Sequence, residues 1–469
     1  MKLSDSGGQN PRAIRLLHVG GLVAGALLLP VAALYLASIA TPLIRHTHGP
    51  AWLPYELFAF LFVLSLGIIT FFLVRRQAQG WQQLIAPALL GLVGLHYLSI
   101  IVAHADYSFD YACYQFAAEA YVQGNNIYLD TLDQCYRYPP LAAQVLGVLF
   151  IGFRRVGSWA LIGGDAWASV FFLYQCCQLY LILAAGWLTY HFGRRLGVAP
   201  VTAAVLAATL FLFNEPLVRT LEFSQVNLWL YVLSLGAVML VSQRPWLAGL
   251  LVALGIHIKL IPGVLLPAWV GARRWRAALA TVVGAGGIVL LQTNLGRAWA
   301  PWQQYIDYFP TAFPATPFRD NSVRGLVNNT LDLLGLEIVA GAASIVALLL
   351  LLAWFGWRFW QREQVVSENS RILGHGIDAL AFSLLAAPAT WEHLFILAIP
   401  VVLWALAICP PERRWQVALA AALMLAVPTF DVYPFSYHRL AGLLWLLWLA
   451  PARLLPDPAR PLRLFGWER

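Results

Sequence analysis

Long apolar runs occupy most of the chain, and many of them end at short clusters of arginine. A helix that crosses the hydrocarbon core of a bilayer needs about 20 apolar residues, so this length predicts an all-α polytopic membrane protein with roughly 10–12 transmembrane helices. The first run is too long for the apolar core of a signal peptide, and no small-residue cleavage site ends it. The apolar runs from which these helices would come lie at about 14–40, 52–74, 82–103, 139–153, 157–193, 199–213, 226–242, 277–292, 337–357, 374–388, 394–409, 415–430 and 440–452.

Composition agrees with this pattern. Of the 469 residues, 60% are hydrophobic and 11% are charged, whereas a soluble chain carries about 25% charged residues. These values exclude a soluble enzyme, a disordered chain and a collagen-like chain. The net charge is +8, but the arginines stand at the ends of apolar runs, which is typical of cytoplasmic helix ends rather than of a nucleic-acid surface. No repeat of fixed period and no soluble segment is found, so we predict one integral membrane domain over residues 1–469.

The arginine clusters predict which loops face which side. Arg75-Arg76 is expected in the cytoplasm, which places the acidic stretch 104–138 outside after one further crossing. A second large outer loop is expected at 293–336, and both termini are expected in the cytoplasm. Arg154-Arg155 and Arg194-Arg195 are also expected inside, although about 157–193 is tight for two crossings. A bacterial inner membrane fits this topology, with the outer loops in the periplasm.

One segment is too short for the two crossings that its flanking charges require. Only 28 residues separate Arg244 from Arg273, and two crossings need about 40. Both ends can therefore be cytoplasmic only if the segment is re-entrant, broken into two half-helices near Pro262. The same segment holds Lys259, one of two lysines in the chain. An ammonium group at membrane depth costs at least about 2.5–3.5 kcal/mol, so it is by default a functional candidate with an anionic partner such as a phosphate. The alternative is that Lys259 reaches an interface.

The first outer loop holds further candidates. Apolar residues at 109, 112, 113, 116, 117, 120 and 121 follow a helical period and predict an amphipathic helix lying on the outer face. Asp110 falls in the first turn of this helix and Asp106 precedes it; each is a candidate catalytic carboxylate or simply a cap. Cys113 and Cys135 share the loop. If the outer side is oxidising, a disulfide between them is permitted, and two free thiols are the alternative.

Two other helix ends on the outer side carry polar groups. Gln225 and Asn227 follow Glu222 at one of them, and Glu392 and His393 follow Pro388 at the other. Capping and interfacial roles are the alternatives to a site in both places. No GxGxxG, P-loop, HExxH or CxxC motif occurs, and no acidic pair has a clear metal spacing, so no obligatory metal is expected.

Taken in order, these segments resemble the GT-C membrane glycosyltransferases, and in particular glycosyltransferase family 87, the polyprenyl-phosphate-mannose-dependent mannosyltransferases. The resemblance covers about residues 100–400. It departs from the family at Ser224, where a glycine is usual, and near Pro388, which a serine usually precedes. The residues that carry it are Phe109-Asp110, Tyr114, Gly124 to Tyr128, Tyr138 to Leu141, Gln225 to Asn227, Lys259 to Pro262, Asn321-Ser322, Pro388, Trp391 and His393.

The resemblance implies a reaction on the outer face, in which Asp110 acts as general base. A sugar, with mannose favoured, would pass from a polyprenyl phosphate to a hydroxyl of a lipid-linked or glycan acceptor, with inversion. The polyprenyl chain would lie among the helices, in contact with membrane lipids. The residues expected to bind the donor phosphate or substrate are Lys259, His393, Arg319, Arg324, Gln225, Asn227, Tyr138, Glu392 and Asp106.

Two other classes of protein remain compatible with the residues alone. A transporter or lipid flippase also places charges and broken helices at membrane depth, but it would be expected to show inverted internal repeats, which we do not find. A membrane protein that only assembles partners is the third reading. A cavity joining Asp110 to Lys259 would favour the transferase over both.

Overall fold

A computed structural model of the chain describes residues 82–103, 109–131, 134–156, 166–309, 320–365, 367–430, 432–456 and 462–463. Within these ranges the secondary structure is helical, with no strand, which confirms the predicted all-α class. The α-helices are α3 (Gln82–Ala103), α4 (Phe109–Gln123), α5 (Leu141–Val156), α6 (Ala166–Arg195), α7 (Pro200–Leu212), α8 (Glu215–Glu222), α9 (Asn227–Leu240), α10 (Pro245–Ile258), α11 (Leu265–Gly271), α12 (Trp275–Gln292), α13 (Ala300–Tyr308), α14 (Val323–Leu333), α15 (Glu337–Glu363), α16 (Glu368–Ala386), α17 (Ile399–Ile408), α18 (Arg414–Leu425) and α19 (His438–Leu449). Short 3₁₀ helices are η3 (Ile261–Val264), η5 (Glu392–Ala398), η6 (Pro411–Arg413) and η7 (Phe435–Tyr437).

The chain divides into two compact units, and the candidate site belongs wholly to one of them. The first unit comprises residues 1–72 and 149–180, and the second comprises 73–148 and 181–469. In the described part of the first unit, Phe150 stacks on Trp167 with ring centroids 4.3 Å apart. All contacts discussed below lie within the second unit.

Several helices of the described chain suit a bilayer. Helices α6, α12 and α15 are long and apolar enough to cross a membrane, and α7 with α8, bent by 51°, would form a fourth span. Shorter apolar helices include α9, α10 and α17. The predicted crossings at 14–40 and 52–74 lie outside the described residues, so the predicted total stays a prediction.

Helix α6 is a single helix of 30 residues, about 45 Å long at 1.5 Å per residue. It provides one crossing rather than two. Residues 157–165 lie outside the described residues, and the side that Arg154-Arg155 and Arg194-Arg195 face stays a prediction.

The packing of α10 and α12 shows the hairpin shape that the re-entrant prediction requires, and its place relative to a membrane stays a prediction. A Cβ atom at Gly249 in α10 would lie only 2.4 Å from the Cβ atom of Ala280 in α12, so the missing side chain permits close approach. Further along both helices, the His257 ring lies 3.0 Å from the Ala285 carbonyl oxygen. Residue numbers at these contacts increase along both helices, from Gly249 with Ala280 to His257 with Ala285. The two helices therefore run parallel. The chain between them must return to the level at which α10 began.

The return is made by η3 and α11. The chain leaves α10 at Lys259, whose backbone is extended (φ −159°, ψ 139°). The turn is tight, since a Cβ atom at Gly255 would lie 2.9 Å from the Pro262 ring. Lys259 therefore occupies the tip of a hairpin whose two ends carry Arg244 and Arg273. The break falls three residues before the predicted Pro262.

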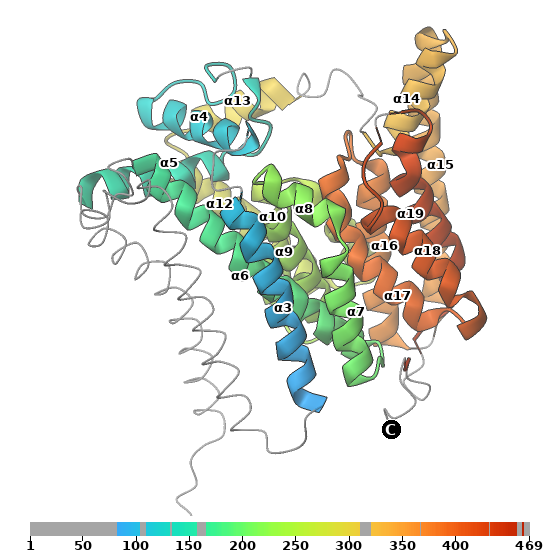
Figure 1. Cartoon of the computed structure of the whole chain (residues 1–469). Helices are drawn as coiled ribbons and strands as arrows, with labels where there is room; N and C mark the ends of the chain where they lie inside the picture. The colour runs from blue at the N-terminus through green and yellow to red at the C-terminus, as the bar shows by residue number, and fades with distance from the viewer. Residues whose placement is uncertain are drawn as a thin grey trace, which may run out of the picture. The chain divides into compact units, whose positions relative to one another are not determined.

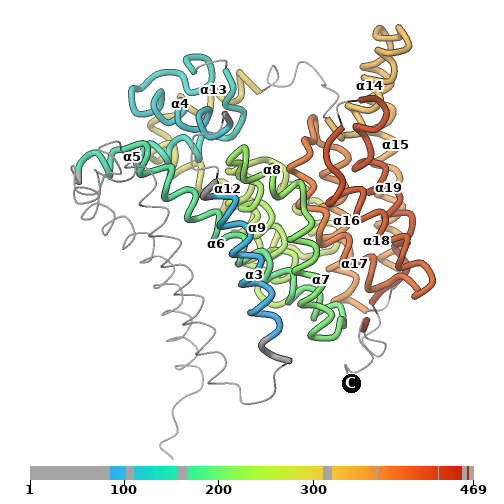
Figure 2. The backbone as a smooth tube through the Cα atoms, viewed as in Figure 1, coloured from blue at the N-terminus to red at the C-terminus, as the bar shows by residue number. Residues whose placement is uncertain are grey.

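Both large outer loops contain helices that pack on one another. Helix α4 confirms the predicted helix in the first loop, and α13 lies beside this loop in Figures 1 and 2. Ile127 donates its backbone N–H to Gln304 (3.2 Å), and the Tyr308 hydroxyl donates to the Gln134 carbonyl (2.7 Å). Over its described residues, the second loop therefore contains two helices, α13 and α14.

The buried face of α4 overlaps the predicted one only in part. Cys113, Ala117 and Ala120 are buried as predicted, whereas Ala112 and Phe116 keep part of their surface exposed. The prediction left out Tyr111, Tyr114 and Ala118, which are almost completely buried. A tyrosine is buried readily when its hydroxyl finds a partner, and Tyr114 finds one in Gln225 (3.3 Å).

The C-terminal half forms a group of adjacent helices, in which α16 to α19 lie side by side with α14 and α15 next to them (Figure 1). The outer end of α16 leads through residues 387–391 into η5. This connection places the predicted Glu392-His393 pair near the hairpin tip. Helix α16 contacts η3, and η5 contacts α9.

Candidate active site

A cavity of about 680 Å³ joins Asp110 on α4 to Lys259 at the hairpin tip. Its volume lies within the range of about 300–1,000 Å³ that is usual for ligand sites. Its walls come from α4, the segment after Cys135, the turn between α8 and α9, the hairpin tip, α13, and the region from the end of α16 to η5. The lining residues that carry the arguments below are Asp110, Cys113, Cys135, Arg137, Tyr138, Phe223, Gln225, Lys259, Tyr305, Pro388, Trp391, Glu392 and His393.

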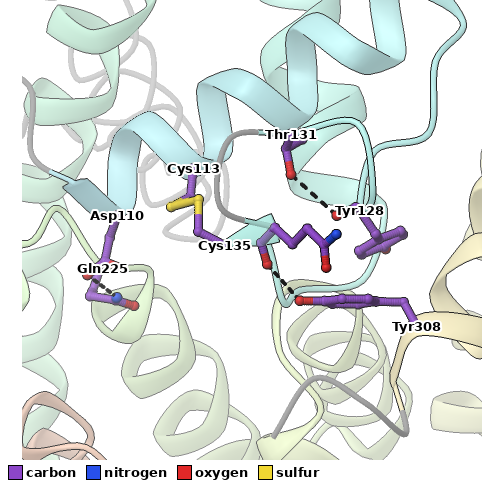
Figure 3. Close-up of a disulfide and its surroundings, with 8 residues drawn as sticks. Asp110, Cys113, Tyr128, Thr131, Cys135, Gln225 and Tyr308 are labelled. Atoms are coloured by element: carbon purple, nitrogen blue, oxygen red, sulfur yellow. Dashed lines mark hydrogen bonds between the residues drawn. A yellow bond between two sulfur atoms is a disulfide. The ribbon is translucent and has the colours of Figure 1, made fainter. Parts of the chain in front are cut away.

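Asp110 is held by a side chain from a distant part of the chain. Gln225 Nε2 donates to Asp110 Oδ2 at 2.6 Å, and the Tyr138 hydroxyl donates to Gln225 Oε1 at 2.9 Å (Figure 3 for Asp110 and Gln225). Gln225 is nearly fully buried. The preceding residue, Ser224, has φ +51°, a conformation that glycine adopts most readily. A glycine at position 224 would adopt this backbone conformation without strain. Serine adopts it here as well, and Gln225 still reaches Asp110.

The electrostatic surroundings of Asp110 suit a proton acceptor. Burial raises the pKa of its carboxyl above the ordinary value, while the hydrogen bond from Gln225 and the charge of Lys259 offset part of that rise. A carboxylate with a raised pKa is a stronger base than an exposed aspartate. A positioned carboxylate of this kind can accept a proton in the transition state.

Replacing Gln225 by leucine is expected to move the acid limb of the kcat/KM profile to higher pH. The base works deprotonated, and its hydrogen bond with Gln225 favours the charged form. Without that bond the pKa of Asp110 rises further, so activity is lost at a higher pH as the solution is acidified. Gln115→Leu is the control, because Gln115 donates instead to Glu119. An acid limb that stays in place or moves down would contradict the assignment.

Lys259 faces the same cavity from the hairpin tip. Its Nζ lies 5.4 Å from the centre of the Tyr138 ring, a cation–π distance. It takes part in none of the ion pairs within 4.0 Å found among the described residues. Asp110 is the carboxylate whose charge acts on it. An ammonium group without a direct carboxylate contact, at the wall of a cavity, can bind an incoming anion.

Glu392 and His393 line the cavity from η5. Both side chains are buried, with 3% and 6% of their surface exposed. Helix α8 fixes this segment, since the Thr220 hydroxyl donates to the His393 carbonyl (3.3 Å) and the ring of Phe223 lies edge-on to that of His393. The predicted pair therefore faces the same space as Asp110 and Lys259.

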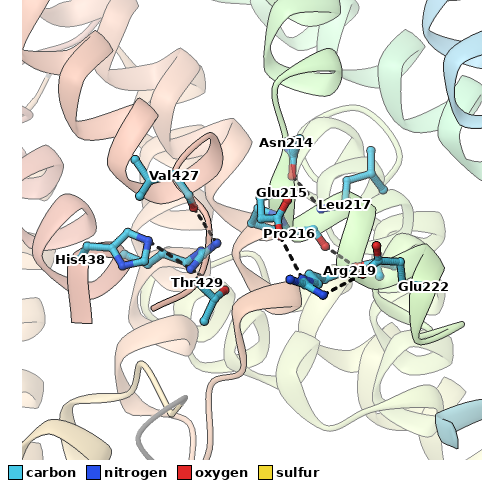
Figure 4. Close-up of polar contacts among 11 residues, drawn as sticks. Asn214, Glu215, Pro216, Leu217, Arg219, Glu222, Val427, Thr429 and His438 are labelled. Carbon is cyan, nitrogen blue, oxygen red and sulfur yellow. Dashed lines mark hydrogen bonds and ion pairs between the residues drawn. The ribbon is translucent and has the colours of Figure 1, made fainter. Parts of the chain in front are cut away.

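A group of charges stands behind η5 and stabilises its surroundings. On α8, Arg219 forms ion pairs with Glu215 and Glu222, each at 2.9 Å (Figure 4). On α19, the fully buried Arg439 donates to the Thr429 hydroxyl at 3.0 Å. Each of these arginines interacts electrostatically with Glu392, so cations stand near this buried side chain outside the cavity wall.

Asp320 links the second outer loop to η5. Its carboxylate accepts from the backbone N–H groups of Ser322 (2.9 Å) and Thr390 (2.7 Å) and from the Ser322 hydroxyl (3.0 Å). The Asn321 N–H donates to the Thr390 carbonyl (2.7 Å). Asp320 is fully buried. The Asn321-Ser322 segment thus fixes the chain between Pro388 and His393 rather than reaching the cavity itself.

Asp320→Leu is expected to lower transfer activity at least about tenfold by releasing the loop before η5, because three buried donors lose their acceptor. Asp320→Asn keeps one carbonyl oxygen for the two backbone donors, and the Ser322 hydroxyl can turn to accept from the amide. It should stay within about threefold of wild type. The two variants are compared by initial rates and melting temperature; equal activity in both would show that this link does not matter to the site.

Two of the predicted site residues that the structure describes, Arg324 and Asn227, are not brought into the cavity. Arg324 lines a neighbouring pocket of about 420 Å³, with Nη1 3.5 Å from the Pro388 carbonyl. Asn227 is fully buried as the first residue of α9 and is not part of the cavity wall, so its side chain was assigned to the wrong face. Asp106 and Arg319 lie outside the described residues.

Sequence reasoning missed several cavity residues. Tyr305 lies on α13, where only a loop was expected, although the aromatic residues at 302, 305 and 309 follow a helical period. Trp391 was noted only through the family resemblance. Over the described residues, no three His, Cys, Asp or Glu side chains gather in a way that would hold a metal ion.

Fold and site together define an integral membrane glycosyltransferase. A sequence profile of glycosyltransferase family 87 matches residues 136–388. The chain belongs to this family, as its motifs predicted, and the transporter and assembly readings lose their support.

Characterised relatives cover most of the chain. It is 26% identical over 391 residues to a polyprenol-phosphate-mannose-dependent alpha-(1-2)-phosphatidylinositol mannoside mannosyltransferase of Mycobacterium tuberculosis, covering 77% of this chain and 87% of that protein. A Mycolicibacterium smegmatis protein of the same description is 25% identical over 372 residues, covering 72% and 79%. A pentamannoside mannosyltransferase of M. smegmatis is 32% identical over 213 residues, covering 43% and 48%. No solved structure matches the chain significantly.

Proposed function

We propose that the chain transfers mannose from a polyprenyl phosphate to a hydroxyl group of a glycolipid at the outer face of the membrane. The observation that carries this proposal is the single cavity that contains both Asp110 and Lys259. The names of the relatives support the donor and the lipid class of the acceptor.

In this reaction the acceptor oxygen attacks the anomeric carbon as the bond to the phosphate oxygen breaks. Asp110 takes the acceptor proton. The electron pair of the broken bond stays with the polyprenyl phosphate, whose growing charge the Lys259 ammonium stabilises. Attack from the face opposite the phosphate inverts the anomeric centre. Tyr138 and Gln225 hold Asp110 and do not exchange protons with the substrate.

The state of the cysteines supports an outer-face site. Cys113 and Cys135 at the cavity form a disulfide, whereas Cys176, Cys177 and Cys409 are free. Disulfides persist in oxidising compartments such as the bacterial periplasm. Cys409 lies next to the Arg413-Arg414 pair, which the positive-inside rule assigns to the cytoplasm. We place both termini in the cytoplasm on the same rule.

Metal independence belongs to the same proposal. A lipid phosphate leaves with one phosphoryl group, so a lysine can balance much of the charge that a nucleotide diphosphate would bring. The reaction rate should therefore be unchanged when a chelator is added to the purified enzyme.

The test uses purified protein in lipid nanodiscs with radiolabelled polyprenyl-phosphate mannose and phosphatidylinositol mannosides as the acceptor probe. Label in a larger glycolipid supports the proposal. Transfer from a polyprenyl-phosphate pentose but not from the mannose donor would show that the sugar is wrong. No transfer from any polyprenyl-phosphate sugar, to this probe or to a total lipid extract, would show that the reaction is wrong.

A further inference from the structure

The Cys113–Cys135 disulfide lies in the wall of the cavity and connects two segments that carry site residues (Figure 3). Cys113 follows Asp110 by three residues on α4, which is about one helical turn, so the two side chains stand on neighbouring turns of one face. Cys135 precedes Tyr138 by three residues. The bridge therefore joins the base-bearing helix to the segment that carries the hydroxyl partner of Gln225.

Hydrogen bonds complete a closed ring through these segments. The Tyr138 hydroxyl donates to Gln225, and Gln225 donates to Asp110. The carboxylate is thus held from both directions: Gln225 fixes its oxygen, and the disulfide fixes the helix turn from which it extends. If either connection is lost, Asp110 can move while the other stays in place.

The other contacts around this ring show what reduction would leave intact. Tyr114 lies edge-on to Tyr136 and Tyr138, with centroids 6.3 Å and 5.1 Å apart. The loop between the two cysteines is anchored on α13 through Ile127. These contacts hold the loop on the protein without the disulfide, but aromatic contacts permit sliding that a covalent bond does not. We expect the reduced protein to stay folded with a less defined position of Asp110.

We infer that the Cys113–Cys135 disulfide is a positioning device for the general base, so that the enzyme reaches full turnover only in its oxidised state. This inference rests on the proposed function. A displacement of about 1 Å at a reacting group can lower a rate about 10²-fold. Lys259 approaches the bridged segments through the ring of Tyr138. The hydroxyl of Tyr138 stays bonded to Gln225 after reduction, so donor binding should be largely unchanged.

The test compares oxidised enzyme with enzyme treated with dithiothreitol. The reagent reduces the Cys113–Cys135 disulfide to two thiols and is itself oxidised to a cyclic disulfide. With polyprenyl-phosphate mannose as donor, reduction should lower kcat at least about tenfold and change the donor KM less than about twofold. The double variant Cys113→Ser/Cys135→Ser should match the reduced enzyme and be insensitive to reductant. Cys177→Ser, which removes a free thiol, should respond as wild type does.

Each outcome decides the inference separately from the proposed function. Unchanged kcat with alkylation of both thiols would overturn the positioning role although transfer itself is proven. Loss of donor binding together with kcat, or loss of the monodisperse elution peak, would show a bridge that only maintains the fold, and would overturn it as well. Failure of the oxidised enzyme to transfer any sugar would count against the proposed function.

Discussion

Asp110→Asn is expected to lower the rate of mannose transfer by about 10²- to 10⁴-fold, the range that a positioned general base contributes. Asparagine has nearly the same shape, and its carbonyl oxygen can still accept the hydrogen bond from Gln225. The variant therefore loses the proton acceptor without losing its place in the wall. Binding of polyprenyl phosphate should not be weakened. The carboxylate that this variant removes is negative and does not itself bind the phosphate, and the Lys259 ammonium group remains in the cavity wall.

A matched control lies on the same helix. Glu119 accepts a hydrogen bond from Gln115 on α4 (2.8 Å) and does not line the cavity. Glu119→Gln removes the same charge from α4 and should leave the rate within about twofold of wild type. Initial rates in nanodiscs, with polyprenyl phosphate affinity measured in parallel, separate catalysis from binding. Near-normal turnover by Asp110→Asn would mean that another group takes the acceptor proton.

Simple lengths and charges made the hairpin of α10, η3 and α11 predictable. The distance between Arg244 and Arg273 is too short for two spans, and Pro262 can neither donate a backbone hydrogen bond nor extend a helix. Both facts are local. They predicted a break near Pro262 in the segment that holds Lys259, and so its value as a phosphate-binding candidate, whereas its place at the tip is seen only in the structure.

Contacts between distant segments could not be predicted in the same way. Asn227 and Gln225 are two residues apart and both carry an amide, yet only Gln225 lines the cavity. Gln225 lies in the turn before α9, whereas Asn227 is the first residue of that helix. Asp320 looks like an ordinary loop residue until Thr390 is seen to donate to it. Thr390 lies 70 residues from Asp320, and a contact over such a separation leaves no periodic pattern in a single sequence.

The broken helix has a chemical use. An unbroken span would carry a lysine side chain across the helix surface, where it would meet lipid or a neighbouring helix. The extended backbone at Lys259 instead ends α10 at the wall of the cavity. Irregular backbone in a membrane protein is tolerated where it lines a cavity. The fold thus places a cation at the wall of the cavity that holds Asp110.

Lys259→Met is therefore expected to be the second most damaging change, with kcat/KM for the donor reduced by about 10²- to 10³-fold, as when one donor to a developing negative charge is removed. Methionine keeps the length and apolar stem of the side chain, so α10 and η3 should stay in place. Affinity for the product, polyprenyl phosphate, should fall as well, because its charge is greatest after the sugar has left.

Two comparisons make this result specific to the ammonium group. Lys259→Arg keeps the charge and should recover part of the activity, although a planar guanidinium does not replace a compact ammonium fully. Arg324→Gln removes a cation from the neighbouring pocket and should stay within about threefold of wild type. Because the Lys259 charge lowers the pKa of Asp110, the methionine variant should also show an acid limb at higher pH. Polyprenyl phosphate binding that is unchanged in Lys259→Met would remove lysine from the phosphate site and leave Asp110 as the only assigned group.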